Sequence, residues 1–322
     1  MPTSRRNSHS SRSSFITPKG STRIDWTVAA LLGAALFAGL NITDKVIMTT
    51  LGLRARTFLL FIGFQTLTTF VVIAVVIQYP SLPAEIWLKG IGVGIFWGFG
   101  AALILWSLSR DEVSRVTPIS QSYPLITVIF AVVLLGESLS VLESVAVVLA
   151  AIGAILAALK FSRGSQSITL SGTFGYLLIA VFLIAIGQTL LKTITDDVSF
   201  WQALGFRGAG MAIVLLPMNL RREITSELLT FVRRPRAVVA LVIDVALATA
   251  ALSLITFAIA TGPLSLTSAI SGSTPLIVFF ATVLLGKKFP QLLGETLSSR
   301  LMIQKLVAAV LVVTGLTIIA LA

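Results

Sequence analysis

The feature that most limits the fold of this chain is a succession of long apolar segments separated by short polar connections. The series runs from Trp26 to the last residue, and each segment has the length of roughly 20 residues that a helix needs to cross a bilayer. The apolar runs are continuous and do not alternate with a period of two, which favours helices over a membrane barrel. Only 11% of the residues are charged, whereas soluble domains carry roughly 25%. The pattern predicts an all-α polytopic membrane protein.

Ten transmembrane helices are predicted. Their ranges are about 26–50, 57–79, 87–109, 113–135, 141–160, 173–193, 199–218, 237–260, 263–285 and 302–322. Residues 1–25 are rich in Ser and Arg, so we expect a disordered polar tail. A polar linker, 161–172, lies at the midpoint and separates a first five-helix unit, 26–160, from a second, 173–322.

The composition excludes several kinds of chemistry. The chain has no cysteine, and its single histidine, His9, lies in the polar tail. Thiol nucleophiles, zinc sites with thiolate or imidazole ligands and Ser-His-Asp triads need residues that the apolar body lacks. We therefore expect no catalytic residues, no metal and no cofactor. The formal charge of +11 is spread over the tail and the connections, which indicates membrane topology and not nucleic-acid binding.

Three short patterns recur in the same order in the two units. They are Asn41 and Lys45 with Gln188 and Lys192; Gly63-Phe64-Gln65 with Gly205-Phe206-Arg207; and Pro124-Leu125-Ile126 with Pro275-Leu276-Ile277. Because each unit has an odd number of helices, the second must enter the membrane in the opposite sense. Such inverted repeats place a substrate site near the midplane and allow one unit to rock against the other.

The chain resembles the EamA family of the drug/metabolite transporter superfamily over about residues 26–322. The resemblance is most specific from Ser114 through Pro118 and Pro124 to Leu134-Leu135-Gly136-Glu137. The second unit departs from this pattern, because Leu284-Leu285-Gly286 is followed by Lys287 and one residue is missing. The resemblance implies ten helices, cytoplasmic termini, and transport of small metabolites such as amino acids.

Polar side chains inside apolar segments are the candidates for substrate binding, because an ionisable group at membrane depth normally faces the bundle interior or water. Asn41 and Lys45 share one helical face, and Gln188 and Lys192 repeat the arrangement. We predict that both faces line one central cavity and bind a carboxylate or another polar group. The alternative for the lysines is that they extend to the membrane interface.

Asp244 stands within an apolar run and is the candidate for proton coupling. The alternative is a structural salt bridge with Arg207, which could instead reach lipid headgroups. Gln121, Tyr123 and Pro124, together with Ser271 and Pro275, form a polar face with small residues where prolines should bend the helices. We predict a cavity wall there, with close helix packing as the alternative. Trp97 lies deep in a glycine-rich helix and is predicted to stack on substrate.

The pattern as a whole predicts a secondary transporter, an exporter of small organic metabolites by alternating access, with proton coupling as an option. A passive facilitator and a membrane enzyme acting on lipid-linked groups are the alternatives. The partners expected are a metabolite and the bilayer of the cell (inner) membrane; a homo-oligomer is left open. The basic residues give two conflicting signals for the orientation in the membrane. Five basic residues before the first helix favour an internal N-terminus, but the basic connection around Arg233 and Arg234 favours an external one. We expect internal termini.

Overall fold

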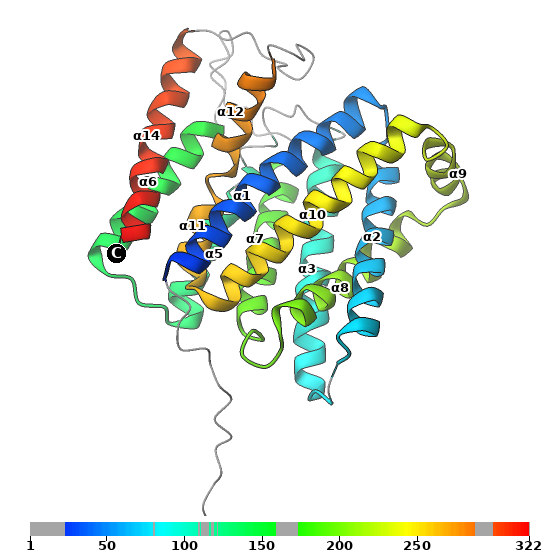
Figure 1. The fold of residues 1–322 in the computed structure, drawn as a ribbon, viewed down its shortest axis with the longest axis horizontal. Helices are drawn as coiled ribbons and strands as arrows, with labels where there is room; N and C mark the ends of the chain where they lie inside the picture. Colours follow the sequence, from blue (N-terminus) through cyan, green and yellow to red (C-terminus); the bar gives the residue numbers. More distant parts are fainter. Residues whose placement is uncertain are drawn as a thin grey trace, which may run out of the picture.

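The computed structural model describes residues 23–79, 81–108, 110, 116, 119–120, 122–158, 173–286 and 299–321. Within them the regular structure is helical and contains no strand, so the all-α prediction is confirmed. The helices of the first half are α1 (Arg23–Lys45) with a π-helical turn η1 (Val46–Thr50), α2 (Ala55–Val76), α3 (Ala84–Leu108), α5 (Tyr123–Leu135) and α6 (Val141–Ala158) (Figure 1). Those of the second half are α7 (Phe174–Lys192), α8 (Phe200–Asn219), α9 (Arg222–Phe231), α10 (Pro235–Thr261), α11 (Leu264–Ser271), α12 (Thr274–Gly286) and α14 (Ser299–Leu321).

Local sequence explains where several of these helices begin and end. At the start of α6, the backbone N–H of Glu143 donates to Ser140 Oγ (3.2 Å) and the N–H of Ser140 donates to the Glu143 carboxylate (2.8 Å). Ser199 and Gln202 form the same reciprocal cap before α8. Such caps satisfy N–H groups that have no acceptor within the helix. α5 ends at Gly136, whose φ of 67° is accessible to glycine at little cost.

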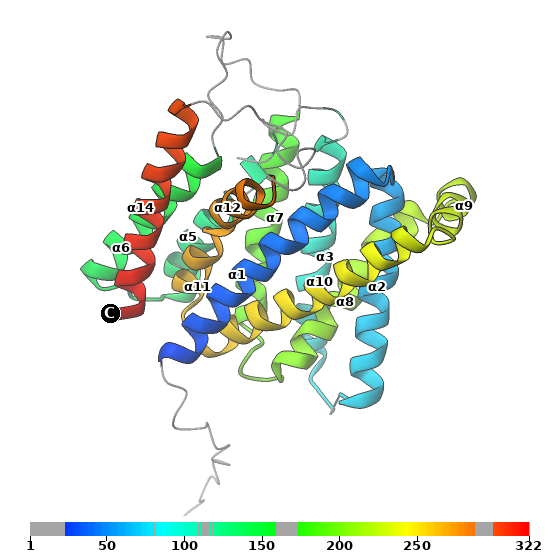
Figure 2. The ribbon, with the colours of Figure 1, turned by 45° about the horizontal axis from the view of Figure 1, so that its top comes forward.

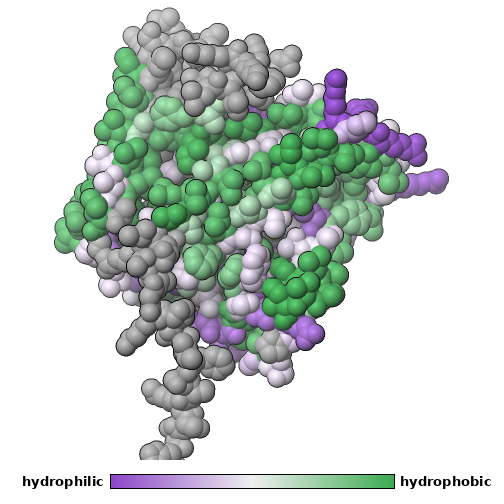
Figure 3. All heavy atoms as spheres, viewed as in Figure 1, coloured by the Kyte–Doolittle hydropathy of each residue, from purple (hydrophilic) through white to green (hydrophobic). Residues whose placement is uncertain are grey.

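Several of the helices have the length and composition of membrane spans. Five qualify among the described residues, namely α1 with η1, α2, α3, α7 and α10; α8 adds a sixth if it is joined to α9, from which it is bent by 108°. Shorter apolar helices lie at 123–135, 141–153, 264–278 and 306–319. Large apolar side chains point outward, for example Val76 (73% exposed) and Val141 (85%). Apolar surface dominates the face in Figure 3, with hydrophilic groups gathered beside α9, as a lipid environment requires.

Most packing takes place between the two halves of the chain. α1 lies against α10, and this pair runs side by side in both views (Figure 1 and Figure 2). α3 packs on α7 and α8, α2 on α8, and α6 on α14. α5 contacts α7 and α11, while α1 also contacts α11 and α12. The buried centre is therefore formed jointly by both halves.

Two of the predicted spans are interrupted at corresponding places. The helix predicted at 263–285 consists of α11 and α12, which are separated at Gly272 and Ser273. In the helix predicted at 113–135, α5 begins at Tyr123 after a turn at Ser122. Pro124 and Pro275 each lie in the first turn after the break. Proline is tolerated there because its missing N–H would have no acceptor. The two prolines thus begin helices, whereas bending within a helix was predicted.

α9 was not among the predicted helices. This helix has ten residues, too few to span a bilayer, and its polar residues hid it from a search for apolar runs. It is held to the start of α2 by Glu227, which accepts a hydrogen bond from Thr57 Oγ1 (2.8 Å) and lies 3.9 Å from the Arg54 guanidinium. Phe231, at its end, is buried with Phe58 and Leu53. α9 therefore packs on the bundle at the edge of the spanning region.

Candidate functional site

Polar side chains are buried where helices of the two halves meet. Arg207 on α8 and Asp244 on α10 are each 2% exposed, and Gln188 on α7 is 4% exposed. Each carries a buried polar atom that lacks a hydrogen-bond partner in the described part of the chain. Burying such groups without partners costs free energy. Polar groups of this kind mark a candidate site, because membrane interiors retain them chiefly for binding or transport.

One cluster joins Trp97, Tyr123 and Arg207. The guanidinium carbon of Arg207 lies 3.8 Å from the centroid of the Trp97 ring, a cation–π geometry. The Trp97 and Tyr123 rings meet edge to face with centroids 5.9 Å apart. Nε and Nη1 of Arg207 and Nε1 of Trp97 are buried donors without an acceptor among the described residues. Two side chains predicted separately as substrate contacts, Trp97 and Tyr123, are therefore brought together, and Arg207 joins them.

Glycine makes this arrangement possible. A Cβ atom on Gly187 of α7 would lie 2.8 Å from Cδ1 of Trp97, so the indole occupies space that any larger residue at 187 would take. A Cβ on Gly98 of α3 would lie 3.0 Å from the Val214 side chain and 3.3 Å from Met211 Cα, both on α8. The glycine-rich sequence of α3 thus allows α7 and α8 to approach closely around Trp97.

A second cluster contains two aspartates. The Asp44 side chain on α1 faces that of Asp244 on α10. Two carboxyl groups in contact can share a hydrogen bond only when one of them carries a proton, because ionised carboxylates only accept. The Oδ1 atoms of both residues, and Nδ2 of Asn41 one turn earlier on α1, are buried without a partner in the described residues. Asp244 and Asn41 were predicted as site residues, whereas Asp44 was not. Its spacing of three residues from Asn41 puts both on one helical face.

Lys192 and Glu137 hold the junction between α10 and α11. The Lys192 ammonium donates to the carbonyls of Ile259 and Gly262, both at 2.8 Å. The Glu137 carboxylate accepts from the backbone N–H groups of Leu264 (2.7 Å) and Ser265 (2.9 Å) and from the Ser265 hydroxyl (2.6 Å). A cation at a helix C-terminus and an anion at a helix N-terminus both interact favourably with the helix dipole. Lys192, predicted to bind substrate, caps α10 here, while Lys45 is exposed.

The capping role gives a stability prediction for the glutamate of the Leu-Gly-Glu motif. Glu137→Gln keeps the size of the side chain but removes its charge and one of its acceptor oxygens. We expect the free energy of unfolding in detergent to fall by about 1 to 3 kcal/mol, measured as a lower melting temperature. Glu143→Gln is the matched control, because glutamine serves equally in its cap. Equal melting of both variants would contradict the role of Glu137.

The two helix breaks adjoin each other. A Cβ on Gly272, after α11, would lie 3.7 Å from the Pro124 Cβ at the start of α5. Ser271 is buried, and its hydroxyl donates to the Thr267 carbonyl (3.0 Å). Ser273 and Thr274 likewise donate to carbonyls of the last turn of α11. α5 and α11 therefore contact each other where Pro124 adjoins the break after Ser271; Gln121 lies outside the described residues.

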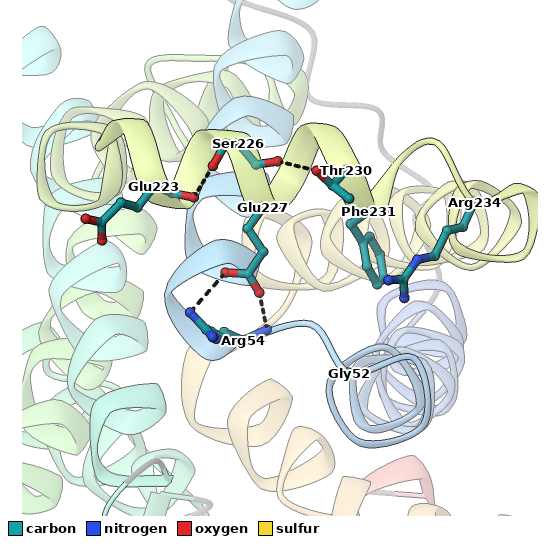
Figure 4. A pocket seen from close by; sticks show the side chains of 8 residues that line it. All are labelled: Gly52, Arg54, Glu223, Ser226, Glu227, Thr230, Phe231 and Arg234. Atoms are coloured by element: carbon teal, nitrogen blue, oxygen red, sulfur yellow. Dashed lines mark hydrogen bonds and ion pairs between the residues drawn. The ribbon is translucent and has the colours of Figure 1, made fainter.

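A separate surface pocket of about 400 Å³ lies between α9 and the start of α2. Figure 4 shows Glu227 pointing toward Arg54, with Glu223 turned away from it. The pocket is lined by Gly52, Arg54, Glu223, Ser226, Glu227, Thr230, Phe231 and Arg234. The Arg54 side chain is 84% exposed, so the pocket belongs to the surface. It shares none of its lining residues with the buried clusters.

The fold and the buried polar clusters define an all-helical integral membrane protein whose interior carries charged and aromatic side chains. Residues 25–159 match the model of the EamA-like transporter family, which confirms over this range the resemblance that was predicted for residues 26–322. That family consists of membrane transporters of the drug/metabolite type. No curated protein sequence matches it significantly. A protein known from a crystal structure shares the fold at 17% identity, with a TM-score of 0.66 over 93% of this chain and 98% of the other.

Proposed function

We propose that the chain is a secondary transporter that exports small organic metabolites, such as amino acids, across the cell membrane by alternating access. The observation that carries the proposal is the meeting of polar groups from both halves in an otherwise apolar bundle. Asn41, Trp97, Tyr123, Gln188 and Ser271 would contact substrate. The Asp44–Asp244 pair would carry the coupled proton.

The helix packing supports two inverted repeats, 26–160 and 173–322. If the halves are repeats, each helix of the first half has an equivalent in the second. In order, α1, α2, α3, α5 and α6 correspond to α7, α8, α10, α11–α12 and α14, and exchanging equivalents should map each helix contact onto another. The contact of α1 with α10 then becomes that of α7 with α3, and α1 with α11 becomes α7 with α5. The pairs α2–α8, α5–α11 and α6–α14 map onto themselves. Each of these contacts occurs in the structure, whereas the extensive contact of α3 with α8 has no comparable counterpart between α10 and α2. Rocking of one repeat against the other would open the shared centre to alternate sides.

Alternating access predicts that Ser271 can be reached from both sides of the membrane. The chain has no cysteine, so Ser271→Cys introduces a unique thiol. We expect a membrane-impermeant maleimide to label it in sealed vesicles of either orientation, because the buried site opens to each side in turn. Arg233→Cys, in an exposed connection, should react from one side only, and the outward-facing Val242→Cys from neither.

Failure to label Ser271→Cys from one of the two sides would refute alternating access at this site. A passive pore would also admit reagent from both sides, so flux must be measured separately. Counterflow of labelled amino acids in proteoliposomes separates the two, because a carrier exchanges substrate saturably whereas a pore only dissipates gradients. Absence of counterflow despite labelling from both sides would favour the passive facilitator.

A further inference from the structure

Arg207 is a fully buried cation whose charge has no counter-ion in the described part of the chain. No carboxylate oxygen there lies within 4.0 Å of its guanidinium; the ion pairs found are Arg54 with Glu227 and Lys89 with Glu85. Buried arginines are normally paired, because removing a charge from water without compensation is costly. The fold therefore keeps a cation at 2% exposure at a net cost in stability.

The contact with Trp97 compensates only part of that cost and leaves the donors available. The guanidinium carbon lies 3.8 Å over the centroid of the Trp97 ring, and this contact uses no N–H group as a hydrogen-bond donor. Nε and Nη1, both buried, are the donors without acceptors. The guanidinium is therefore held beside the indole, and its Nε and Nη1 donors can each bind an acceptor.

We propose that Arg207 binds the carboxylate of the transported metabolite, which makes small organic monocarboxylates the substrate class. This inference rests on the proposed transport function. A planar carboxylate matches the in-plane donors of arginine. One guanidinium balances one negative charge, and Arg207 is the one fully buried basic side chain among the described residues, so a doubly charged phosphate fits less well. Trp97 and Tyr123 give the apolar remainder of the ligand an aromatic wall.

The proposal is tested by binding to the purified full-length chain in detergent. Benzoate and acetate serve as carboxylate probes, and benzamide is the neutral isostere of benzoate. We expect benzoate, and acetate more weakly, to raise the melting temperature saturably, because a ligand that binds the folded state stabilises it; benzamide should not. Arg207→Met should bind benzoate about tenfold or more weakly, as expected for losing a hydrogen bond to a charged group.

A second measurement separates binding from a structural role. If Arg207 is an uncompensated buried cation, Arg207→Met should melt at or above the wild-type temperature without ligand while losing the benzoate response. Arg110→Met is the matched control: Arg110 also lies over an indole, 4.5 Å from the Trp106 ring, but is exposed. It should respond to benzoate like the wild type. Trp97→Phe, which keeps a ring under the guanidinium, should bind benzoate with intermediate affinity.

Three results would overturn the proposal. They are an absent response of the wild type to both carboxylates, an equal response to benzoate and benzamide, and an Arg207→Met protein that melts lower yet binds benzoate normally. A short-chain anionic phospholipid tested alongside distinguishes lipid from metabolite, because a response confined to the lipid would assign Arg207 to headgroup binding. None of these outcomes affects the labelling of Ser271→Cys, so failure of the carboxylate proposal is distinct from failure of alternating access.

Discussion

Replacing either carboxyl group of the Asp44–Asp244 pair with an amide should abolish proton-driven accumulation of substrate while leaving substrate exchange intact. The two side chains face each other between α1 and α10, one helix from each half. An amide can still pair with the remaining carboxyl group, so Asp44→Asn or Asp244→Asn should preserve the helix contact. It cannot take up or release a proton. The coupling step would be lost without loss of the fold.

The measurement uses proteoliposomes with an imposed pH gradient and a labelled amino acid that the wild type exchanges. In either variant the inside and outside concentrations should become equal, because no driving force remains, whereas counterflow should continue. Asp196→Asn, an exposed loop carboxylate, is the control and should accumulate substrate like the wild type. Gradient-driven accumulation that survives in the double variant Asp44→Asn with Asp244→Asn, where neither carboxyl group remains, would exclude this pair as the proton carrier.

The helices could be predicted from the sequence because the hydrocarbon core imposes a length and a composition on every span. The same criterion explains the errors. α9 is too short and too polar to meet the criterion for a membrane span. The break at Gly272 and Ser273 lies within an apolar run, so the average composition of the run gives no sign of it. Helix ends inside a span depend on hydrogen bonds such as that from the Thr274 hydroxyl to the Ser271 carbonyl, which composition does not reveal.

Several residues of the candidate site could be predicted from the sequence, but the contacts that they make could not. Asp244 and Gln188 stood out because polar residues in apolar segments are costly. Whether such a residue binds substrate or another part of the chain depends on which helix faces it. Lys192 shows the difference, because the helix end that it caps lies about 70 residues away in sequence. Arg207 and Trp97 are likewise joined only by tertiary packing, so their contact was absent from the sequence prediction.

The crossing of α3 and α8 beneath this cluster should be intolerant of even one added methyl group. A Cβ atom on Gly94 would lie 2.7 Å from both Gly210 Cα and Met211 N, and it would also collide with the Arg207 carbonyl oxygen. All three are backbone atoms, so relief requires the helices to separate. Gly94→Ala should lower the free energy of unfolding by about 3 kcal/mol, the upper range for overpacking, measured by thermal unfolding and by the monodisperse fraction after purification.

The control is Gly175→Ala on α7, where a Cβ would meet no atom within 4 Å; it should melt at or above the wild-type temperature, since alanine favours helix over glycine. Because the collision involves Arg207 itself, surviving Gly94→Ala protein should also bind benzoate more weakly as the guanidinium shifts from Trp97. An unchanged melting temperature in Gly94→Ala would contradict a direct backbone contact between α3 and α8, and with it the packing that holds Arg207 against the indole.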